Sequence, residues 1–229
     1  MKTIGMLGGM SWESTGLYYR TINEETKRLR GGLHSAPVVL VSVDFQEIET
    51  LQHRDDWAAC ADILCDSARR VEAAGADFLL ICTNTMHRVA PEIESAIGIP
   101  LLHIADATAA RVKAAGIERI GLLGTRFTME QEFYRGRLEQ HGIEVLVPPR
   151  RDRDSVHRVI YEELCMGDVR DESRQEFLRI ISDLSKSGAQ GVIEGCTEIV
   201  MLVQQEYTDV PLFDTTEIHG CEAVAEALR

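Results

Sequence analysis

Short apolar runs alternate with longer amphipathic segments along the whole chain. The apolar, often β-branched runs predict buried strands, and the segments between them have helical spacing. Strands are predicted over residues 3–9, 37–43, 77–82, 101–104, 119–125, 144–147, 188–195 and 210–215. Helices are predicted after the glycine turn at 8–9, over 57–74, 89–97, 109–115, 129–140, 156–164 and 173–186, and at the end of the chain. Residues 44–51 and 150–156 are expected to form loops, the first with a short helical turn. This alternation predicts an α/β fold with mainly parallel sheets flanked by helices.

Three segments of the chain recur in the same order, at offsets of 116, 113 and 111 residues. They pair residues 3–9 with 119–125, 75–85 with 188–198, and 99–104 with 210–215. Three ordered matches with nearly constant offsets indicate a duplicated unit. We therefore expect two pseudo-symmetric, doubly wound subdomains over residues 1–105 and 106–215, with the active site in the cleft between them. The last helix, over residues 216–229, is expected to pack back on the first subdomain.

Composition restricts the classes of partner. The chain has 229 residues, 45% of them hydrophobic and 27% charged, which is typical of an ordinary globular protein. No apolar run reaches membrane-spanning length, and glycines interrupt the N-terminus too early for a signal peptide. A cytoplasmic location and no membrane partner are expected. The formal net charge of −13 also argues against nucleic acid as a partner.

The six cysteines include no CxxC pair, so free thiols are expected in a reducing compartment. Cys60 and Cys65 are spaced poorly for a metal, and Cys82 with His87 lacks two further ligands. We therefore expect no metal site. Any cysteine with a chemical role has to be identified from its surroundings.

Small polar clusters follow four of the predicted strands, and in open parallel sheets ligands bind beyond these carboxyl ends. An ungapped alignment of the two copies sets Thr83 opposite Cys196 and Cys82 opposite Gly195. Two groups on opposite faces of a carbon suit a reaction that removes a proton and returns one on the other side. A thiolate suits it because its pKa lies near neutral, and a helix N-terminus after the strand is expected to lower that pKa further.

The segments Gly8–Thr15, Cys82–His87 and Gly195–Glu198 resemble the aspartate/glutamate racemase family, in the enterobacterial aspartate-racemase-like branch, over nearly the whole chain. The resemblance implies an amino-acid racemase that needs no cofactor and no metal, binds a small amino acid such as aspartate or glutamate, and forms a homodimer.

The chain departs from the family pattern at two positions. The family's first catalytic cysteine stands immediately before Asn-Thr, where this chain has Thr83, and Cys82 comes one residue early. Because successive strand residues point to opposite faces, Cys82 is expected to face the core if Thr83 faces the site. Cys196 is therefore predicted to be the main acid/base and Thr83 a weaker group on the opposite face. Cys82 is the less favoured catalytic candidate.

The second departure is Cys165, which stands where many relatives carry a lysine thought to meet the substrate's distal carboxylate. A thiol supplies no fixed positive charge, so a different or broader substrate range becomes plausible. The alternative sources of that charge are Arg54, Arg88, His53 and His87.

Further substrate contacts are expected from residues near the strand tips, several through the resemblance alone. These candidates are Met10, Ser11, Gln52, Asn84, Thr85, Thr125, Thr128, Cys165, Thr197 and Glu198. Several candidates have a plainer interpretation. A role in capping a helix or closing a turn is the alternative for Thr83, Asn84, Thr85, Thr125, Thr128 and Glu198, and a buried structural thiol is the alternative for Cys196.

Two other functions compete with racemisation. A one-cysteine decarboxylase or isomerase of the same superfamily protonates a carbanion from a single face. A non-catalytic amino-acid-binding protein also fits, because a thiol and an alcohol make an ill-matched acid–base pair.

Overall fold

A computed structural model describes all 229 residues and divides the chain into two compact units. The first contains Met1–Ile104 and Thr216–Arg229, and the second contains Ala105–Thr215. Each unit is a parallel sheet flanked by helices, which confirms the predicted α/β class. No helix is both long enough and apolar enough to cross a membrane.

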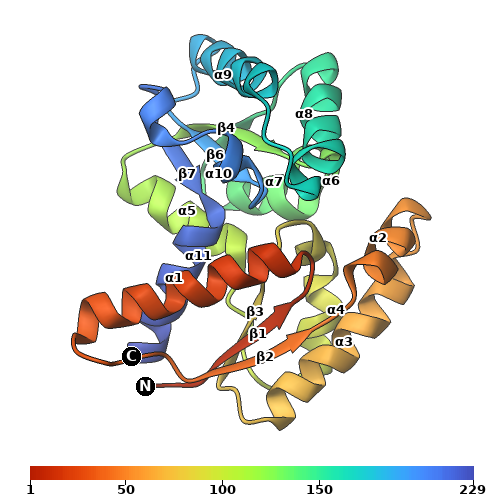
Figure 1. The fold of residues 1–229 in the computed structure, drawn as a ribbon, viewed down its shortest axis with the longest axis vertical. Coiled ribbons are helices and arrows are strands. Elements are labelled where there is room, and N and C mark those ends of the chain that lie inside the picture. The colour runs from red at the N-terminus through yellow and green to blue at the C-terminus, as the bar shows by residue number, and fades with distance from the viewer. The chain divides into compact units, whose positions relative to one another are not determined.

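The first unit is built on a parallel sheet with the strand order β2-β1-β3. Its strands are β1 (Ile4–Gly8), β2 (Val38–Ser42) and β3 (Phe78–Ile81), and its helices are α1 (Trp12–Arg30), α2 (Phe45–His53), α3 (Trp57–Ala73), α4 (Ala90–Ala96) and most of α11 (Thr215–Leu228), with the 3₁₀ turn η1 (Thr85–Val89). Tyr18 and Ile22 of α1 and Val224 of α11 pack on one face of the sheet, against Met6 and Cys82. Helix α3 contacts all three strands (Figure 1). Val71 of α3 lies against Gly5 of β1.

The second unit repeats this order with one more strand, β5-β4-β6-β7, again all parallel. Its strands are β4 (Arg119–Gly124), β5 (Glu144–Leu146), β6 (Val192–Gly195) and β7 (Leu212–Asp214). Its helices are α5 (Ile104–Ala114), α6 (Arg126–Glu130), α7 (Glu132–Gln140), α8 (Arg150–Glu162), α9 (Asp171–Lys186) and α10 (Ile199–Leu202), with the 3₁₀ turns η2 (Leu164–Met166) and η3 (Gln205–Tyr207). Helices α8 and α9 pack together against β4 (Figure 1). An ion pair between Asp106 and Arg137 joins α5 to α7.

The strand register agrees with the ungapped alignment of the sequence repeat. Leu7 pairs with Ile81 in the first unit, and Leu123 pairs with Glu194 in the second. These pairs are related by the offsets of 116 and 113 residues that the sequence shows. Two residues beyond each pair, the chain leaves the sheet at equivalent positions. Those positions are Thr83 and Cys196.

The predicted strand over residues 101–104 is wrong apart from one bridge, between Leu79 and Leu101. The Leu79 amide donates to the Pro100 carbonyl at 2.9 Å, and the Leu102 amide donates to the Leu79 carbonyl at 2.9 Å. Pro100 has no amide hydrogen to add to the ladder, and the chain enters α5 at Ile104. The pairing therefore stops after one residue.

The two predicted loops, over residues 44–51 and 150–156, are also wrong. Asp44 caps α2 by accepting a hydrogen bond from the Gln46 amide at 3.0 Å, so a full helix replaces the short turn. Helix α8 begins at Arg150, and its charged residues find partners on other helices: Asp152 pairs with Arg179 at 2.7 Å. Pairing of this kind makes a highly charged segment compatible with a helix.

The helix predicted over residues 129–140 is broken into α6 and α7. Gln131 lies between them with extended backbone angles, φ −97° and ψ 150°. Its amide still donates to the Phe127 carbonyl at 3.1 Å, which closes the last turn of α6. The side-chain periodicity continues across the break, which is why the pattern indicated a single helix.

Glu194 is a buried carboxyl group in the sheet of the second unit. It is 3% exposed, its Oε1 has no hydrogen-bond partner, and it pairs across the sheet with Asp214 of β7. Burial, together with the negative charge of Asp214, raises the pKa of Glu194 to about 8. The carboxyl group is therefore largely protonated in the folded protein at neutral pH.

This raised pKa predicts that the folded state loses stability between about pH 4.5 and pH 8. Over that range the unfolded chain releases the Glu194 proton and the folded chain keeps it, so the free energy of unfolding falls as pH rises. Glu194→Gln removes the titration. We expect urea unfolding of the variant to show a smaller drop between pH 5 and pH 8, by up to about 4 kcal/mol. Glu206→Gln, at an exposed position, is the matched control and should unfold like the parent protein. Equal pH profiles for all three proteins would contradict the prediction.

Candidate active site

Cys196 and Glu198 form a hydrogen-bonded pair just beyond the end of β6. The Cys196 Sγ–H donates to Glu198 Oε2 at 2.9 Å. The thiol is partly exposed, whereas Glu198 is 9% exposed. The strand ends in Gly195, where a Cβ would lie 2.8 Å from the Leu123 carbonyl oxygen, so the neighbouring strand leaves room only for glycine. The thiol is thus presented at the strand end with a proton acceptor already in contact.

The pKa of this thiol is raised, contrary to the expectation that a helix N-terminus would lower it. Burial is the largest cause, and the negative charge of Glu198 and the neighbouring Cys165 thiol add to it. Helix α10, which follows, spans only Ile199–Leu202, too short to offset the loss of hydration. The resting site therefore holds a protonated thiol.

The other tip of the second unit contains Thr125 and Thr128, at the start of α6. Thr125 is the N-cap of this helix, and its hydroxyl accepts a hydrogen bond from the Thr128 amide at 3.4 Å. The two hydroxyl oxygens are 3.2 Å apart, and both residues are buried. The structure thus gives Thr125 the capping role that was the alternative to substrate contact. Thr197, beside Cys196, is also buried.

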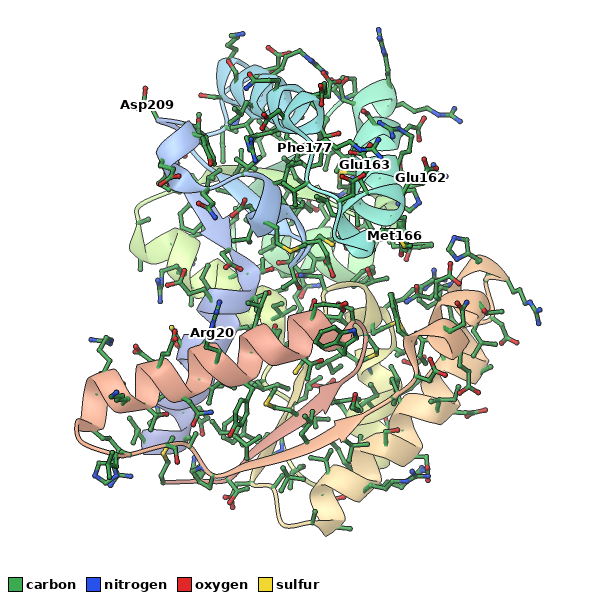
Figure 2. The ribbon with its side chains drawn as sticks, in the orientation of Figure 1. Arg20, Glu162, Glu163, Met166, Phe177 and Asp209 are labelled. Carbon is green, nitrogen blue, oxygen red and sulfur yellow. The ribbon has the colours of Figure 1, made fainter.

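Cys165 lies in the turn η2, which packs against α10, the helix after Cys196. Gly167 ends the turn in a left-handed conformation, with φ 74°. In the sequence Cys165 lies between the buried Glu163 and the exposed Met166, which Figure 2 labels. The partly exposed Cys165 thiol is therefore held near the Cys196 loop, with no positive charge of its own.

Glu163 anchors this turn through a small polar network. Its carboxylate accepts hydrogen bonds from the Ser173 hydroxyl at 2.5 Å and from Arg158 at 2.9 Å. Burial disfavours the charged form, but these bonds and the charge of Arg170 hold the pKa of Glu163 below its ordinary value. The network fixes where α8 ends and so where Cys165 lies.

In the first unit, Thr83 and Cys82 occupy different environments. Cys82 is completely buried in the core cluster with Ile4 and Phe78, and burial raises the pKa of its thiol strongly. Thr83 is partly exposed, and no protein group is hydrogen-bonded to its hydroxyl. The carbonyl of Thr83 is bonded to His87, whose Nδ1 lies 2.8 Å away. The side chain available at this strand end is thus an alcohol.

Asn84 and Thr85 continue this tip and are both buried. Asn84 is the N-cap residue of η1 by position, but its side chain makes no capping hydrogen bond, and its carbonyl accepts from the His87 amide at 3.1 Å. The Asn84 side chain is thus not used as a helix cap.

The turn after β1 brings Met10 and Ser11 to the start of α1. Gly9 has φ +90°, and a Cβ there would lie 2.2 Å from the Val43 carbonyl oxygen, so only glycine fits. Thr15 holds the turn: its hydroxyl accepts from the Gly9 amide and donates to the Ser11 carbonyl, each at 2.8 Å. Ser11 caps α1, accepting from the Ser14 amide at 3.3 Å. Met10 is buried.

Gln52 lies on α2 and is 4% exposed. Its Nε2 donates to the Met86 sulfur at 2.8 Å, and its buried Oε1 has no hydrogen-bond partner. Because Met86 belongs to η1, this contact ties Gln52 to the Thr83 tip. The side-chain oxygen of Gln52 is therefore available to accept a hydrogen bond.

Of the four alternative sources of positive charge, three are already engaged. Arg88 lies over the Trp57 ring at 4.0 Å, and His53 bonds to Glu49 at 3.0 Å. His87 is 1% exposed, and burial together with nearby histidines lowers its pKa well below its ordinary value. Arg54, at the end of α2, is exposed and has no ion-pair partner. Among these candidates it alone remains available to an anionic group.

Sequence reasoning missed a buried polar chain in the first unit. His219 of α11 bonds to the Tyr18 hydroxyl and to the Leu102 carbonyl, each at 2.8 Å, and the rings of His87 and His103 lie 4.5 Å apart. In the sequence, only the position of His103, at the carboxyl end of a predicted strand, pointed to this group of buried polar side chains. His219 lies in a helix whose apolar spacing gave no hint of a histidine partner.

Comparison with known proteins decides the family. The family model of the Asp/Glu/Hydantoin racemases matches residues 7–223. The chain belongs to this racemase family. A structure from Yersinia pestis assigned to the Asp/Glu racemases is 56% identical, with both chains covered in full and a TM-score of 0.94. An aspartate racemase homologue from Pyrococcus horikoshii is 32% identical, again over the whole of both chains, with a TM-score of 0.86.

A more distant relative of this racemase-family protein is the broad-specificity amino-acid racemase of Bacillus subtilis. It is 22% identical over 220 residues, which cover 93% of this chain and 92% of that protein. The family resemblance stated from the sequence motifs is thus confirmed. The matched region contains both strand-end positions, Thr83 and Cys196.

The contact between Cys196 and Glu198 makes a prediction about thiol reactivity in this racemase-family protein. Glu198→Gln removes the negative charge that raises the thiol pKa. The thiolate should then form at lower pH, and the alkylation profile of Cys196 should move to lower pH than in the parent protein. Iodoacetamide labelling, followed by peptide mass spectrometry to separate Cys196 from Cys165, measures this. Glu172→Gln, at an exposed position, is the control. An unchanged or upward-shifted profile in the Glu198 variant would contradict the prediction.

Proposed function

We propose that the protein is an amino-acid racemase that needs no cofactor and acts on aspartate, glutamate or a related amino acid. Cys196 is the main acid/base, and Thr83 serves the opposite face of the α-carbon. The observation that carries the proposal is the partly exposed Cys196 thiol at a strand end, hydrogen-bonded to the carboxylate of Glu198 at 2.9 Å. Family membership supports the reaction class.

The first step moves two protons. Glu198 takes the proton of the Cys196 thiol, and the resulting thiolate removes the α-proton of one enantiomer, which leaves a carbanion. Because the thiol pKa is raised at rest, the thiolate is a strong base once formed. Backbone amides at the strand tips stabilise the charge that develops next to the substrate carboxylate.

The second step returns a proton to the other face of the carbanion. The Thr83 hydroxyl donates it, directly or through a water, and recovers a proton from solvent, while Glu198 releases to solvent the proton that it took from Cys196. An alcohol is a weaker acid than a thiol, so this face is the slower one. The equilibrium still favours neither enantiomer, since a catalyst leaves it unchanged. Exchange of the α-proton on the Cys196 face is therefore faster than inversion.

Cys82 is disfavoured as the second acid/base on two grounds. It is fully buried among apolar side chains, and burial raises its pKa strongly. The strand register also makes Thr83, not Cys82, the equivalent of Cys196. At this position the chain therefore has an alcohol, Thr83, in place of the cysteine of the family pattern.

The substrate range follows from the charges near the site. Cys165 offers no positive charge for a distal carboxylate, and Arg54 is the exposed cation among the candidates. We propose a range wider than aspartate alone, which the name of the Bacillus subtilis relative also favours. The resemblance to the family further supports a homodimer in the cytoplasm, and light scattering of the purified protein tests the dimer.

The racemase proposal predicts the outcome of a deuterium-exchange screen. Both enantiomers of each amino acid are incubated with the protein in D₂O, and proton NMR with chiral chromatography separates exchange from inversion. At least one amino acid should show both. Cys196→Ala should lower both rates by about 10²–10⁴-fold, because a positioned acid/base contributes that much. Thr83→Ala should lower inversion and leave exchange on the Cys196 face. Cys82→Ala should retain activity within a few-fold.

The competing functions give other results in the same experiment. Carbon dioxide release from an arylmalonate, without exchange of any amino acid, would identify a decarboxylase. Binding of an amino acid by calorimetry without deuterium uptake would identify a binding protein. Loss of activity in Cys82→Ala with a fully active Thr83→Ala would show that the assignment of the second acid/base is wrong.

A further inference from the structure

His87 lies directly behind the Thr83 tip, where the proposed acid/base mechanism gives it no role. It is 1% exposed, in the first turn of η1. Its Nδ1 is 2.8 Å from the Thr83 carbonyl oxygen, and its Nε2 is 3.3 Å from the amide nitrogen of Ile104. Both ring nitrogens thus contact backbone atoms of the first unit.

These partners fix the tautomer of the ring. A carbonyl oxygen only accepts, so Nδ1 carries the proton and donates to Thr83. The Ile104 amide only donates, so Nε2 is unprotonated and accepts. Burial, with His103 and His219 nearby, lowers the pKa of His87 well below its ordinary value, so the ring stays neutral. A neutral ring with this tautomer satisfies both bonds at once.

The neighbours of His87 hold the ring in place. His103 is tilted against it, with ring centroids 4.5 Å apart, and His219 lies edge-on at 5.9 Å. His219 is fixed in turn, because its Nε2 donates to the Leu102 carbonyl and its Nδ1 accepts from the Tyr18 hydroxyl. The imidazole therefore has little freedom to turn away from Thr83.

We infer that His87 is a positioning residue for Thr83: its Nδ1–H holds the Thr83 carbonyl and so sets the direction of the Thr83 hydroxyl at the end of β3. This inference rests on the proposed role of Thr83. The hydroxyl has no hydrogen-bond partner of its own, so its position depends on the backbone that carries it. A displacement of about 1 Å can lower a rate by about a hundredfold, so this bond matters to the chemistry.

Two variants of similar size separate the two bonds. The side-chain amide of His87→Asn places a donor where Nδ1 stands, so it keeps the bond to Thr83 and loses the bond to Ile104. His87→Gln places an acceptor where Nε2 stands, so it keeps the bond to Ile104 and loses the bond to Thr83. Each variant gives up one buried hydrogen bond, which makes them matched controls for stability.

The experiment measures exchange and inversion in D₂O, with the amino acid that the wild-type protein exchanges fastest. His87→Asn should keep inversion within about threefold of wild type. His87→Gln should lower inversion by about 10- to 100-fold, as expected for a misplaced acid/base. Exchange on the Cys196 face should stay within about threefold in both, which shows that each variant is folded. Melting temperatures of the two variants should be similar.

The outcomes that would overturn the inference are distinct from those that would overturn the function. Normal inversion in His87→Gln, or an equal loss in both variants, shows that His87 has no specific effect on Thr83. If Thr83→Ala itself inverts its substrate normally, the proposed role of Thr83 fails, and the role of His87 fails with it. A selective loss in both Thr83→Ala and His87→Gln, with His87→Asn active, supports both.

Discussion

The register of parallel pairing between the first and third strands of each unit determines which side chain stands at each strand end. The pairing of β1 with β3 ends at Ile81 and the pairing of β4 with β6 ends at Gly195, and Thr83 and Cys196 lie beyond these ends. A shift by one residue would exchange the two faces of the strand. It would bring Cys82 out of the core and bury Thr83, because side chains alternate. The chemistry at the first strand end is therefore a consequence of backbone hydrogen bonds in the sheet.

The same pairing explains why glycine and cysteine occupy equivalent positions in the two units. A Cβ at Gly195 would contact the Leu123 carbonyl oxygen and Thr128 of the capped α6. In the first unit the corresponding Cys82 finds space in the apolar cluster beneath α1 and α11. The two units thus share a backbone pattern but differ in the space beside this strand position. That difference, and not the duplication, decides where a thiol can be buried.

The strands and the position of both tips could be predicted from the sequence, because apolar runs and glycines report directly on buried strands and turns. The helical state of residues 150–156 could not, since it depends on partners such as Arg179 that lie far along the chain. The missing strand after Pro100 likewise depends on where α5 begins. The raised pKa of Cys196 was missed for a similar reason. Local sequence shows a helix start, whereas burial is set by the whole unit.

The raised pKa of the Cys196 thiol determines the protonation state of the resting site. A cysteine with a low pKa would be a thiolate at rest, reactive toward oxidants and alkylating agents as well as toward a substrate. With burial and Glu198 both favouring the protonated form, Cys196 keeps its proton in the resting site. The carboxylate that raises the thiol pKa is also the group in contact with the thiol proton, at 2.9 Å. An approaching positive charge, such as the ammonium group of an amino acid, would lower the thiol pKa by favouring the thiolate. In the proposed mechanism, the Cys196 thiolate then forms mainly when a substrate is bound, and Glu198 is the group in place to accept the thiol proton.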